Sequence, residues 1–150
     1  MLHTSGIYVF ESKNYSGWIF GNEADKQWTQ SFRSGHKERF YNPCMQNISH
    51  VWHLEEFLRS VPLKAFHSVI VFSERCELRK IMLTSDRHIV VKRNRLRNTI
   101  APMLSQALLT TEEIDAFHKK LYPQTQLSEE QKQAHIQRVT AMQQKNNPHR

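Results

Sequence analysis

The stretch GIYVFESKNYSGWIFG, Gly6 to Gly21, begins as an apolar strand and becomes charged before it ends. Residues 6–10 read GIYVF, an apolar run that is typical of a buried strand. Glu11 and Lys13 follow without a break. Residues two apart in a strand point to the same face, so these two charged side chains share one face of the strand.

The spacing of Glu11 and Lys13 leaves two interpretations open. The rise of a strand separates the two backbone positions by about 6.6 Å, so we expect no close salt bridge between them. Both side chains could still reach a metal-bound phosphate above the strand end, because a carboxylate binds hard divalent cations and an ammonium stabilises negative charge. The alternative is a strand end that meets solvent, where Glu and Lys are common.

Composition places the chain among globular proteins with a basic surface. Its 150 residues suffice for one hydrophobic core. The net charge of +7 favours a polyanion partner, although a basic surface without such a partner is equally compatible.

Cys44 and Cys76 form neither a CxxC pair nor a disulfide framework, so we expect ordinary buried or half-buried thiols in a reduced, cytoplasmic protein. No run is long enough for a membrane helix, and we expect no membrane partner.

Periodicity predicts a mixture of strands and helices around one sheet. Strands are expected at residues 7–13, 18–20 and 28–32, joined as an antiparallel meander, and later at residues 67–72 and 88–92. The run HSVIVF from His67 is apolar enough for a strand covered on both faces. Between the two sets lies a helix with Asn42 as N-cap and Pro43 at its first position. The fold class predicted is α/β (α+β).

The helix after Asn42 has an apolar side and a polar side. The polar side carries Gln46, Ser49, His50 and His53. His50 and His53 could bind Zn²⁺ or Ni²⁺ together, but neither a cysteine partner nor an HExxH motif accompanies them. We therefore interpret the two histidines as part of a polar helix face.

The tail changes character after residue 108. Thr110-x-x-Glu113 and Ser128-x-x-Gln131 are capping-box patterns, and Pro123 lies between them. We predict a helical C-terminal extension over residues 109–150, with two helices separated at Pro123 and a frayed end.

Several motifs together resemble the nuclease-related domain (NERD) family, over about residues 6–100. They are E-x-K-N at 11–14, W-I-x-G at 18–21, W-x-Q at 28–30, N-P-x-x-Q-N at 42–47 and the strand SVIVFS at 68–73. That family is similar to the restriction-endonuclease-like PD-(D/E)XK superfamily. The resemblance implies a NERD-like domain over residues 1–108, with a central mixed sheet flanked by helices.

The resemblance also implies a site and a chemistry. Glu11 corresponds to a metal ligand for Mg²⁺ or Mn²⁺, and Lys13 to the catalytic lysine. Gln46 corresponds to a glutamine on the helix near the site, although a solvated helix residue is an equal alternative. The implied activity is divalent-metal-dependent cleavage of DNA.

The sequence departs from the family pattern at its start. In the superfamily an Asp on the preceding strand shares the metal, whereas here only residues 1–5 precede Gly6 and none is acidic. We expect the family's N-terminal helix and strands to be missing and a metal to be held weakly. Asp25 or Glu23 is not expected to replace the Asp. A catalytically impaired nucleic-acid-binding or interaction module is the alternative function.

Two further expectations concern partners. The strand at residues 7–13 would lack a neighbour and expose an edge, which invites self-association. The densest basic run is Lys92, Arg93, Arg95 and Arg97. It contacts nucleic-acid phosphates if the nuclease resemblance holds, and is otherwise a solvated loop.

Overall fold

The computed structural model describes residues 1–126, together with 133 and 137. The chain forms two compact units, Met1–Ile114 and Asp115–Arg150. From the sequence we placed the boundary slightly earlier, between residues 108 and 109.

The first unit contains strands, two α-helices and three short 3₁₀ segments. The strands are β1 (Leu2–His3), β2 (Gly6–Lys13), β3 (Gly17–Asn22), β4 (Gln27–Ser31), β5 (Lys37–Tyr41), β6 (Phe66–Phe72), β7 (Cys76–Met82) and β8 (His88–Lys92). The helices are α1 (Pro43–Leu58) and α2 (Leu96–Ile100), and α3 (Thr111–Thr125) crosses into the second unit. The α+β class predicted from periodicity is confirmed.

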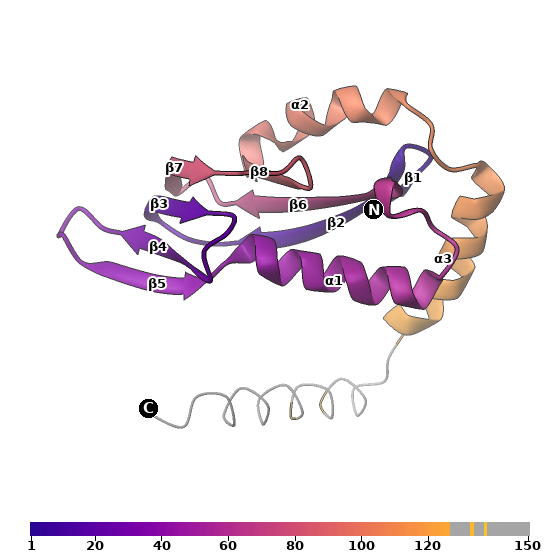
Figure 1. The fold of residues 1–150 in the computed structure, drawn as a ribbon, viewed down its shortest axis with the longest axis horizontal. Helices are drawn as coiled ribbons and strands as arrows, with labels where there is room; N and C mark the ends of the chain where they lie inside the picture. Colours follow the sequence, from indigo (N-terminus) through magenta and orange to yellow (C-terminus); the bar gives the residue numbers. More distant parts are fainter. Residues whose placement is uncertain (127–132, 134–136, 138–150) are drawn as a thin grey trace. The chain divides into compact units, whose positions relative to one another are not determined.

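One four-stranded sheet has the order β1-β2-β6-β8 (Figure 1). The apolar strand β6 lies inside it and pairs in parallel with both β2 and β8. Its sequence FHSVIVF is buried at every position except His67, as expected for a strand covered on both faces. β1 pairs only with the first two residues of β2, Gly6 and Ile7.

The remaining strands form a second four-stranded sheet, β5-β4-β3-β7. We predicted an antiparallel meander of the strands now labelled β2, β3 and β4, and this prediction was wrong. The observed meander consists of β3, β4 and β5 and excludes β2. The apolar run of β2 is instead paired with β6 in the first sheet. Gly17 opens β3 with φ +71°, a conformation that glycine adopts at no steric cost, and a Cβ there would lie 2.5 Å from the Ser31 carbonyl oxygen.

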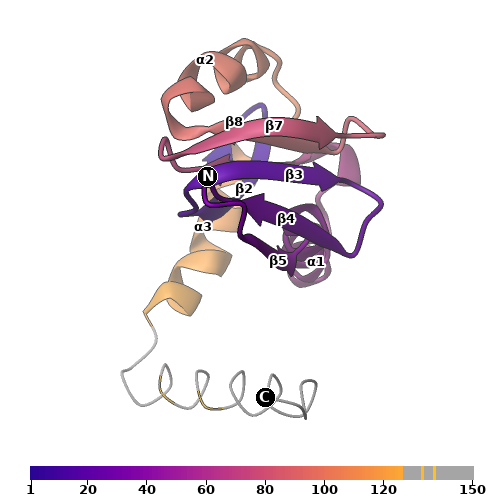
Figure 2. The ribbon, with the colours of Figure 1, turned by 90° about the vertical axis from the view of Figure 1, so that its left-hand side faces the viewer.

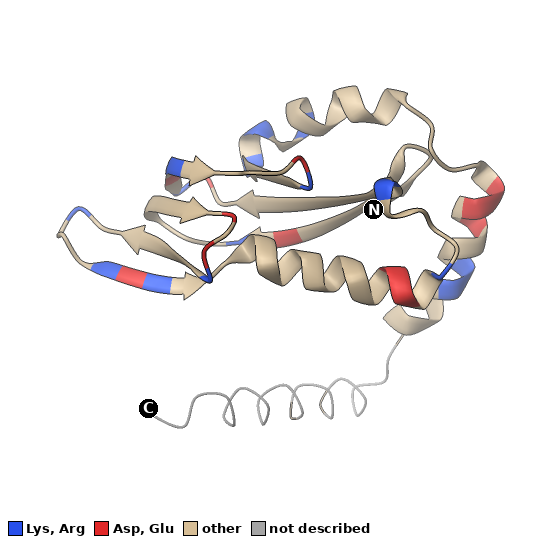
Figure 3. Cartoon of the chain, viewed as in Figure 1, with Lys and Arg blue, Asp and Glu red and all other residues tan. Residues whose placement is uncertain are grey.

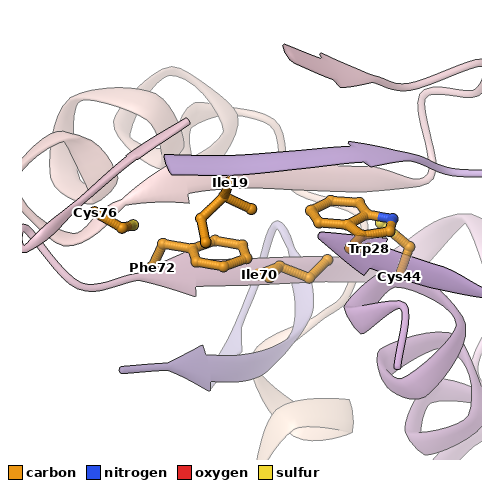
Figure 4. Packing of buried hydrophobic residues seen from close by; sticks show 6 residues of the cluster. All are labelled: Ile19, Trp28, Cys44, Ile70, Phe72 and Cys76. Carbon is orange, nitrogen blue, oxygen red and sulfur yellow. The ribbon is translucent and has the colours of Figure 1, made fainter. Parts of the chain in front are cut away.

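The two sheets pack around one apolar cluster (Figure 4). It contains Ile19, Trp28, Cys44, Ile70, Phe72 and Cys76. The rings of Trp28 and Phe72 stack with centroids 6.2 Å apart. A Cβ on Gly21 would lie 2.1 Å from the Trp28 ring, so glycine is required where β3 crosses this ring. Both cysteines are free and buried, as expected, and burial and the charge of Glu23 raise the pKa of Cys44 to about 12.

The opposite face of the first sheet has its own cluster. Tyr8, Val69, Val71 and Val91 are buried there, and Leu96 and Ile100 of α2 pack against them. β2 and β6 are therefore covered by α2 on one side, and by α1 and the second sheet on the other. The sequence predicted one central sheet, and the structure contains that sheet and a second one.

Helix ends follow the predicted capping chemistry. The Asn42 side-chain oxygen accepts a hydrogen bond from the Cys44 N–H at 2.8 Å, as the N-cap prediction required. The capping box at α3 is also present, with Thr110 and Glu113 bonded to each other's backbone N–H. The predicted break at Pro123 was wrong, because α3 continues through it to Thr125. The helix predicted from Ser128 lies outside the described residues.

Candidate functional site

Glu11 and Lys13 lie at the carboxyl end of β2, on the face that meets α1. The Lys13 Nζ is 2.8 Å from the Glu11 Oε1, and both side chains are only 14% exposed. The expectation that they would form no close salt bridge was therefore wrong. The strand rise separates their backbones, but a lysine stem is long enough to bend back to a carboxylate on the same face.

Gln46 joins this pair from the first turns of α1. The Lys13 Nζ donates a hydrogen bond to the Gln46 Oε1 at 2.8 Å. Gln46 is therefore half-buried and in contact with Lys13, and its role in the site stays a prediction. Lys13 is held between a carboxylate on its own strand and an amide oxygen on a helix.

His50 is a further member of the site, and our interpretation of it as part of a polar helix face missed it. Its Nε2 lies 3.6 Å from the Glu11 Oε2, and its side chain is 53% exposed. His53 does not accompany it, because the His53 Nδ1 lies 2.6 Å from the Ser49 carbonyl oxygen. The signal for His50 was its spacing of four residues from Gln46, which places both on one stripe of α1.

Tyr15 also lies near the site and was missed. Burial raises the pKa of its phenol, and the negative charges of Glu11 and Glu38 raise it further. Its ring packs on Phe40 with centroids 4.5 Å apart. The Glu11 charge therefore acts on the Tyr15 phenol, which stays protonated at neutral pH.

A buried polar chain fixes α1 against the sheet beneath the site. The Asn47 Nδ2 donates to the Val9 carbonyl oxygen at 2.9 Å and to the Ser68 Oγ at 2.8 Å. The Ser68 Oγ also lies 2.8 Å from the His88 Nδ1. Asn47 Oδ1 is buried and has no partner among the described residues. Since Asn47 follows Gln46, this chain sets where Gln46 meets Lys13.

The donor atoms of the site suit a loosely held cation. Within residues 1–126, 133 and 137, no group of three or more His, Cys, Asp or Glu side chains could hold a metal ion. Glu11 offers a carboxylate, and His50 an imidazole nitrogen beside it. Mg²⁺ retains water and is often bound by one or two carboxylates and a substrate phosphate, so this set fits a cation that is completed by substrate.

Glu23 is engaged elsewhere. Its carboxylate accepts hydrogen bonds from the Thr84 N–H at 2.7 Å, from the Ser85 N–H at 2.9 Å and from the Ser85 hydroxyl. Burial works to raise the pKa of Glu23, but these hydrogen bonds and nearby His88 outweigh it and lower the pKa to about 2. Glu23 therefore holds the loop after β7 and is not aimed at the Glu11 site.

The predicted basic run lies at the start of α2 (Figure 3). Lys92 ends β8, Arg93 and Arg95 form a 3₁₀ turn, and Arg97 is in α2. The Arg93 Nε is 3.1 Å from the Glu74 Oε1. In the described part of the chain, none of these four residues bonds to Glu11, Lys13 or Gln46.

Part of the chain matches a known protein family. Residues 1–73 match the model of a family described as nuclease-related domain, and this range includes Glu11, Lys13, Gln46 and His50. The chain is also 33% identical over 119 residues to an uncharacterized protein of Bacillus anthracis. That match covers 76% of this chain and 52% of the relative, so the chain spans about half of the relative's length. No solved structure matches the chain.

The helices were compared in length and hydropathy with membrane-spanning segments. None in the described part of the chain is long and apolar enough to cross a bilayer.

Proposed function

We propose, from the match of residues 1–73 to the nuclease-related domain family, that the protein is a divalent-metal-dependent nuclease that cuts DNA. Membership in the family supports a nuclease-related function in general. The observation that carries the specific proposal is the Lys13 ammonium, held between the Glu11 carboxylate and the Gln46 amide oxygen, each at 2.8 Å. A positioned ammonium next to a carboxylate at a strand end suits phosphodiester hydrolysis.

Each residue of the site has a role in this proposal. Glu11, with His50 beside it, would hold Mg²⁺ or Mn²⁺, and a bound ion supplies Lewis acidity at the phosphate. Lys13 would donate hydrogen bonds to a phosphate oxygen and stabilise the negative charge that grows as water attacks phosphorus. Gln46 keeps the Lys13 ammonium over the strand end while the site is free. The bond from phosphorus to the leaving sugar oxygen breaks as the bond to water oxygen forms.

Phosphate contacts away from the scissile bond complete the proposal. Arg95 and Arg97 are exposed and, among the described residues, have no ion-pair partner. With Lys92 and Arg93 they would neutralise phosphates along the DNA backbone, a contribution that weakens as salt rises.

A second candidate function is binding without cutting. It is favoured by the small donor set of the site, because no group of three or more His, Cys, Asp or Glu side chains in the described residues could hold a metal ion. The same fold would then bind DNA and fail to hydrolyse it.

Cleavage of supercoiled plasmid with Mg²⁺ or Mn²⁺ tests the proposal. We expect Glu11→Gln and Lys13→Met each to reduce the cleavage rate by at least about a hundredfold, because each removes charge stabilisation in the transition state. DNA binding, measured by fluorescence anisotropy in EDTA, should be largely retained. Glu56→Gln is the matched control, since Glu56 is an exposed carboxylate on α1.

The outcomes separate the two candidates. Equal cutting by Glu11→Gln and the unmodified chain would assign the activity to a contaminant or another site. Binding of DNA without cutting by the unmodified chain at any metal concentration would favour the non-catalytic function.

A further inference from the structure

The outer face of the sheet β5-β4-β3-β7 gathers aromatic and basic side chains. Ile19 and Trp28 point inward to the apolar cluster, so residues one position away along each strand point outward. The outward residues with aromatic or basic side chains are Trp18, Phe20, Lys37, Arg39, Tyr41 and Lys80. Figure 2 shows these four strands side by side, and neither α1 nor α2 lies over them.

The strand register aligns several of these residues in one row. Arg39 lies opposite Thr29, Thr29 opposite Phe20, and Phe20 opposite Lys80, across all four strands. The Phe20 side chain is 36% exposed despite being apolar. Neighbouring strands are about 4.8 Å apart, so the row places a cation on either side of an exposed ring within about 10 Å.

A second aromatic residue on this face carries a stacked guanidinium. The register between β3 and β7 shifts after Ile19, which leaves Arg79 as the extra residue of a β-bulge. The Arg79 guanidinium carbon lies 5.4 Å from the centroid of the Trp18 ring. A bulge re-aims side chains, and here it places a planar cation on an aromatic ring.

The charge on this face is strongly one-sided. Within the described part of the chain, Lys37, Arg39 and Lys80 have no ion-pair partner. Of the acidic residues in these four strands, Glu38 lies on the opposite face of β5, together with Phe40, and Glu77 is bound to Arg79 at 2.8 Å. The free charge on the face is therefore positive, which suits a polyanion.

We propose that this face binds single-stranded DNA. Aromatic side chains that stack bases, combined with a positive surface that follows the backbone, are the components of single-strand binding. Trp18 and Phe20 are two residues apart on one strand, about 6.6 Å, which is roughly twice the 3.4 Å rise between bases in a duplex strand. A base stacked on Phe20 and another on the Arg79 guanidinium over Trp18 must therefore be unstacked from each other, and a duplex cannot provide this. The choice of DNA rests on the proposed function, whereas the single-strand geometry does not.

Binding to a fluorescein-labelled oligo-dT, measured by anisotropy in EDTA with the full chain, tests the proposal. We expect Phe20→Ala to weaken binding by roughly five- to a hundredfold, the effect of losing one stacked base. Phe20→Tyr keeps the ring and should restore most of the affinity. Trp52→Ala is the matched control, because Trp52 is an exposed aromatic residue on α1.

An abasic oligonucleotide with the same number of phosphates separates stacking from charge. The unmodified chain should bind it less tightly than oligo-dT, and Phe20→Ala should bind the two alike. Arg39→Gln combined with Lys80→Gln should lower the salt dependence of binding, compared with Lys64→Gln as a control for a single exposed cation elsewhere.

Each outcome bears on the proposal independently of cleavage, because the Glu11→Gln chain can be used throughout. Equal affinity of Phe20→Ala and the unmodified chain, or equal affinity for abasic DNA and oligo-dT, would overturn it. Tighter binding of oligo-rU than oligo-dT would overturn the assignment to DNA, and binding of duplex in preference to single strands would overturn the single-strand geometry. Loss of oligo-dT binding in Phe20→Ala with unchanged thermal stability supports it.

Discussion

The negative charge of Glu23 stabilises the loop after β7. Its carboxylate receives two backbone N–H groups and the Ser85 hydroxyl from the loop after β7. Hydrogen bonds to the charged form favour that form, which explains the pKa of about 2 despite partial burial. The loop between β7 and β8 is thereby tied to the end of β3.

Substituting Glu23→Gln should lower stability at neutral pH but not in strong acid. A depressed folded-state pKa contributes stability above the unfolded pKa, near 4.5, and loses it as pH falls toward the folded pKa, near 2. We expect a loss of about 1 to 2 kcal/mol at pH 7, because charge-assisted hydrogen bonds are replaced by weaker ones. Thermal unfolding from pH 7 to pH 2 measures this.

The control for this prediction is Glu77→Gln, an exposed carboxylate that pairs with Arg79. Its melting temperature should change little, because exposed ion pairs contribute little. A constant difference between Glu23→Gln and the unmodified chain from pH 7 to pH 2 would contradict the assigned role.

At the scale of elements, strands with an apolar run or a regular apolar–polar alternation were predictable, and the charged strands β5 and β7 were not. β2, β6 and β8 were predicted because their runs are apolar, and α1 because Asn42 and Pro43 mark its start. β5 and β7 read KERFY and CELRKIM and were missed, because charged residues interrupt both runs, on both faces of β5 and on the outward face of β7. Their outward faces do not need apolar residues, so the pattern of hydrophobic residues did not indicate a strand.

Asn42 connects α1 to the β3–β4 loop as well as capping the helix. Its Nδ2 lies within hydrogen-bond distance of the carbonyl oxygens of Asn22, Glu23 and Asp25. Asn42→Ala should therefore cost about 2 to 4 kcal/mol, because it removes the helix cap together with the hydrogen bonds from Nδ2 to the loop carbonyls. Urea unfolding of the variant and the unmodified chain gives this difference.

Thr110→Ala is the matched cap variant, because Thr110 caps α3 at an exposed position. It should cost about 1 kcal/mol or less. Similar losses for the two variants would indicate that the contacts of Asn42 with the loop contribute nothing.

At the scale of the whole molecule, β2 has an edge that is only partly paired, because β1 pairs with Gly6 and Ile7 alone. The Tyr8 N–H and carbonyl both bond to Met1, at 2.9 and 2.7 Å, so they point away from β6. Backbone direction alternates along a strand, which means that the Phe10 and Ser12 groups face the same open side. Phe10 is 39% exposed at this edge.

We expect this edge to cause concentration-dependent self-association of the chain. Unpaired strand edges pair with other chains, and a lysine at the edge prevents it. Phe10→Lys should therefore remain monomeric at concentrations where the unmodified chain associates, as measured by sedimentation equilibrium. Trp52→Lys controls for the loss of an exposed aromatic, and equal association of both variants would place the contact elsewhere.

The site could be predicted in part. Glu11, Lys13 and Gln46 were identified from motifs that lie within continuous sequence. The Glu11–Lys13 contact, His50 and Tyr15 were not, because they depend on how α1 and the turn after β2 pack over the strand end. A stripe of polar residues on a helix gives no sign of which strand it will face.

The pairing of β2 with β6 has a consequence for synthesis of the chain. Ile7 pairs with Phe66 and Lys13 with Phe72, so β2 has left the ribosome well before its partner exists. Translation adds about 5–20 residues per second, so the apolar strand GIYVF remains for seconds without the hydrogen bonds that it later forms with β6. The β3–β4–β5 hairpins can form during that interval, since their pairs are local in sequence. The nascent chain should therefore engage chaperones that bind exposed apolar strands until residue 72 has emerged.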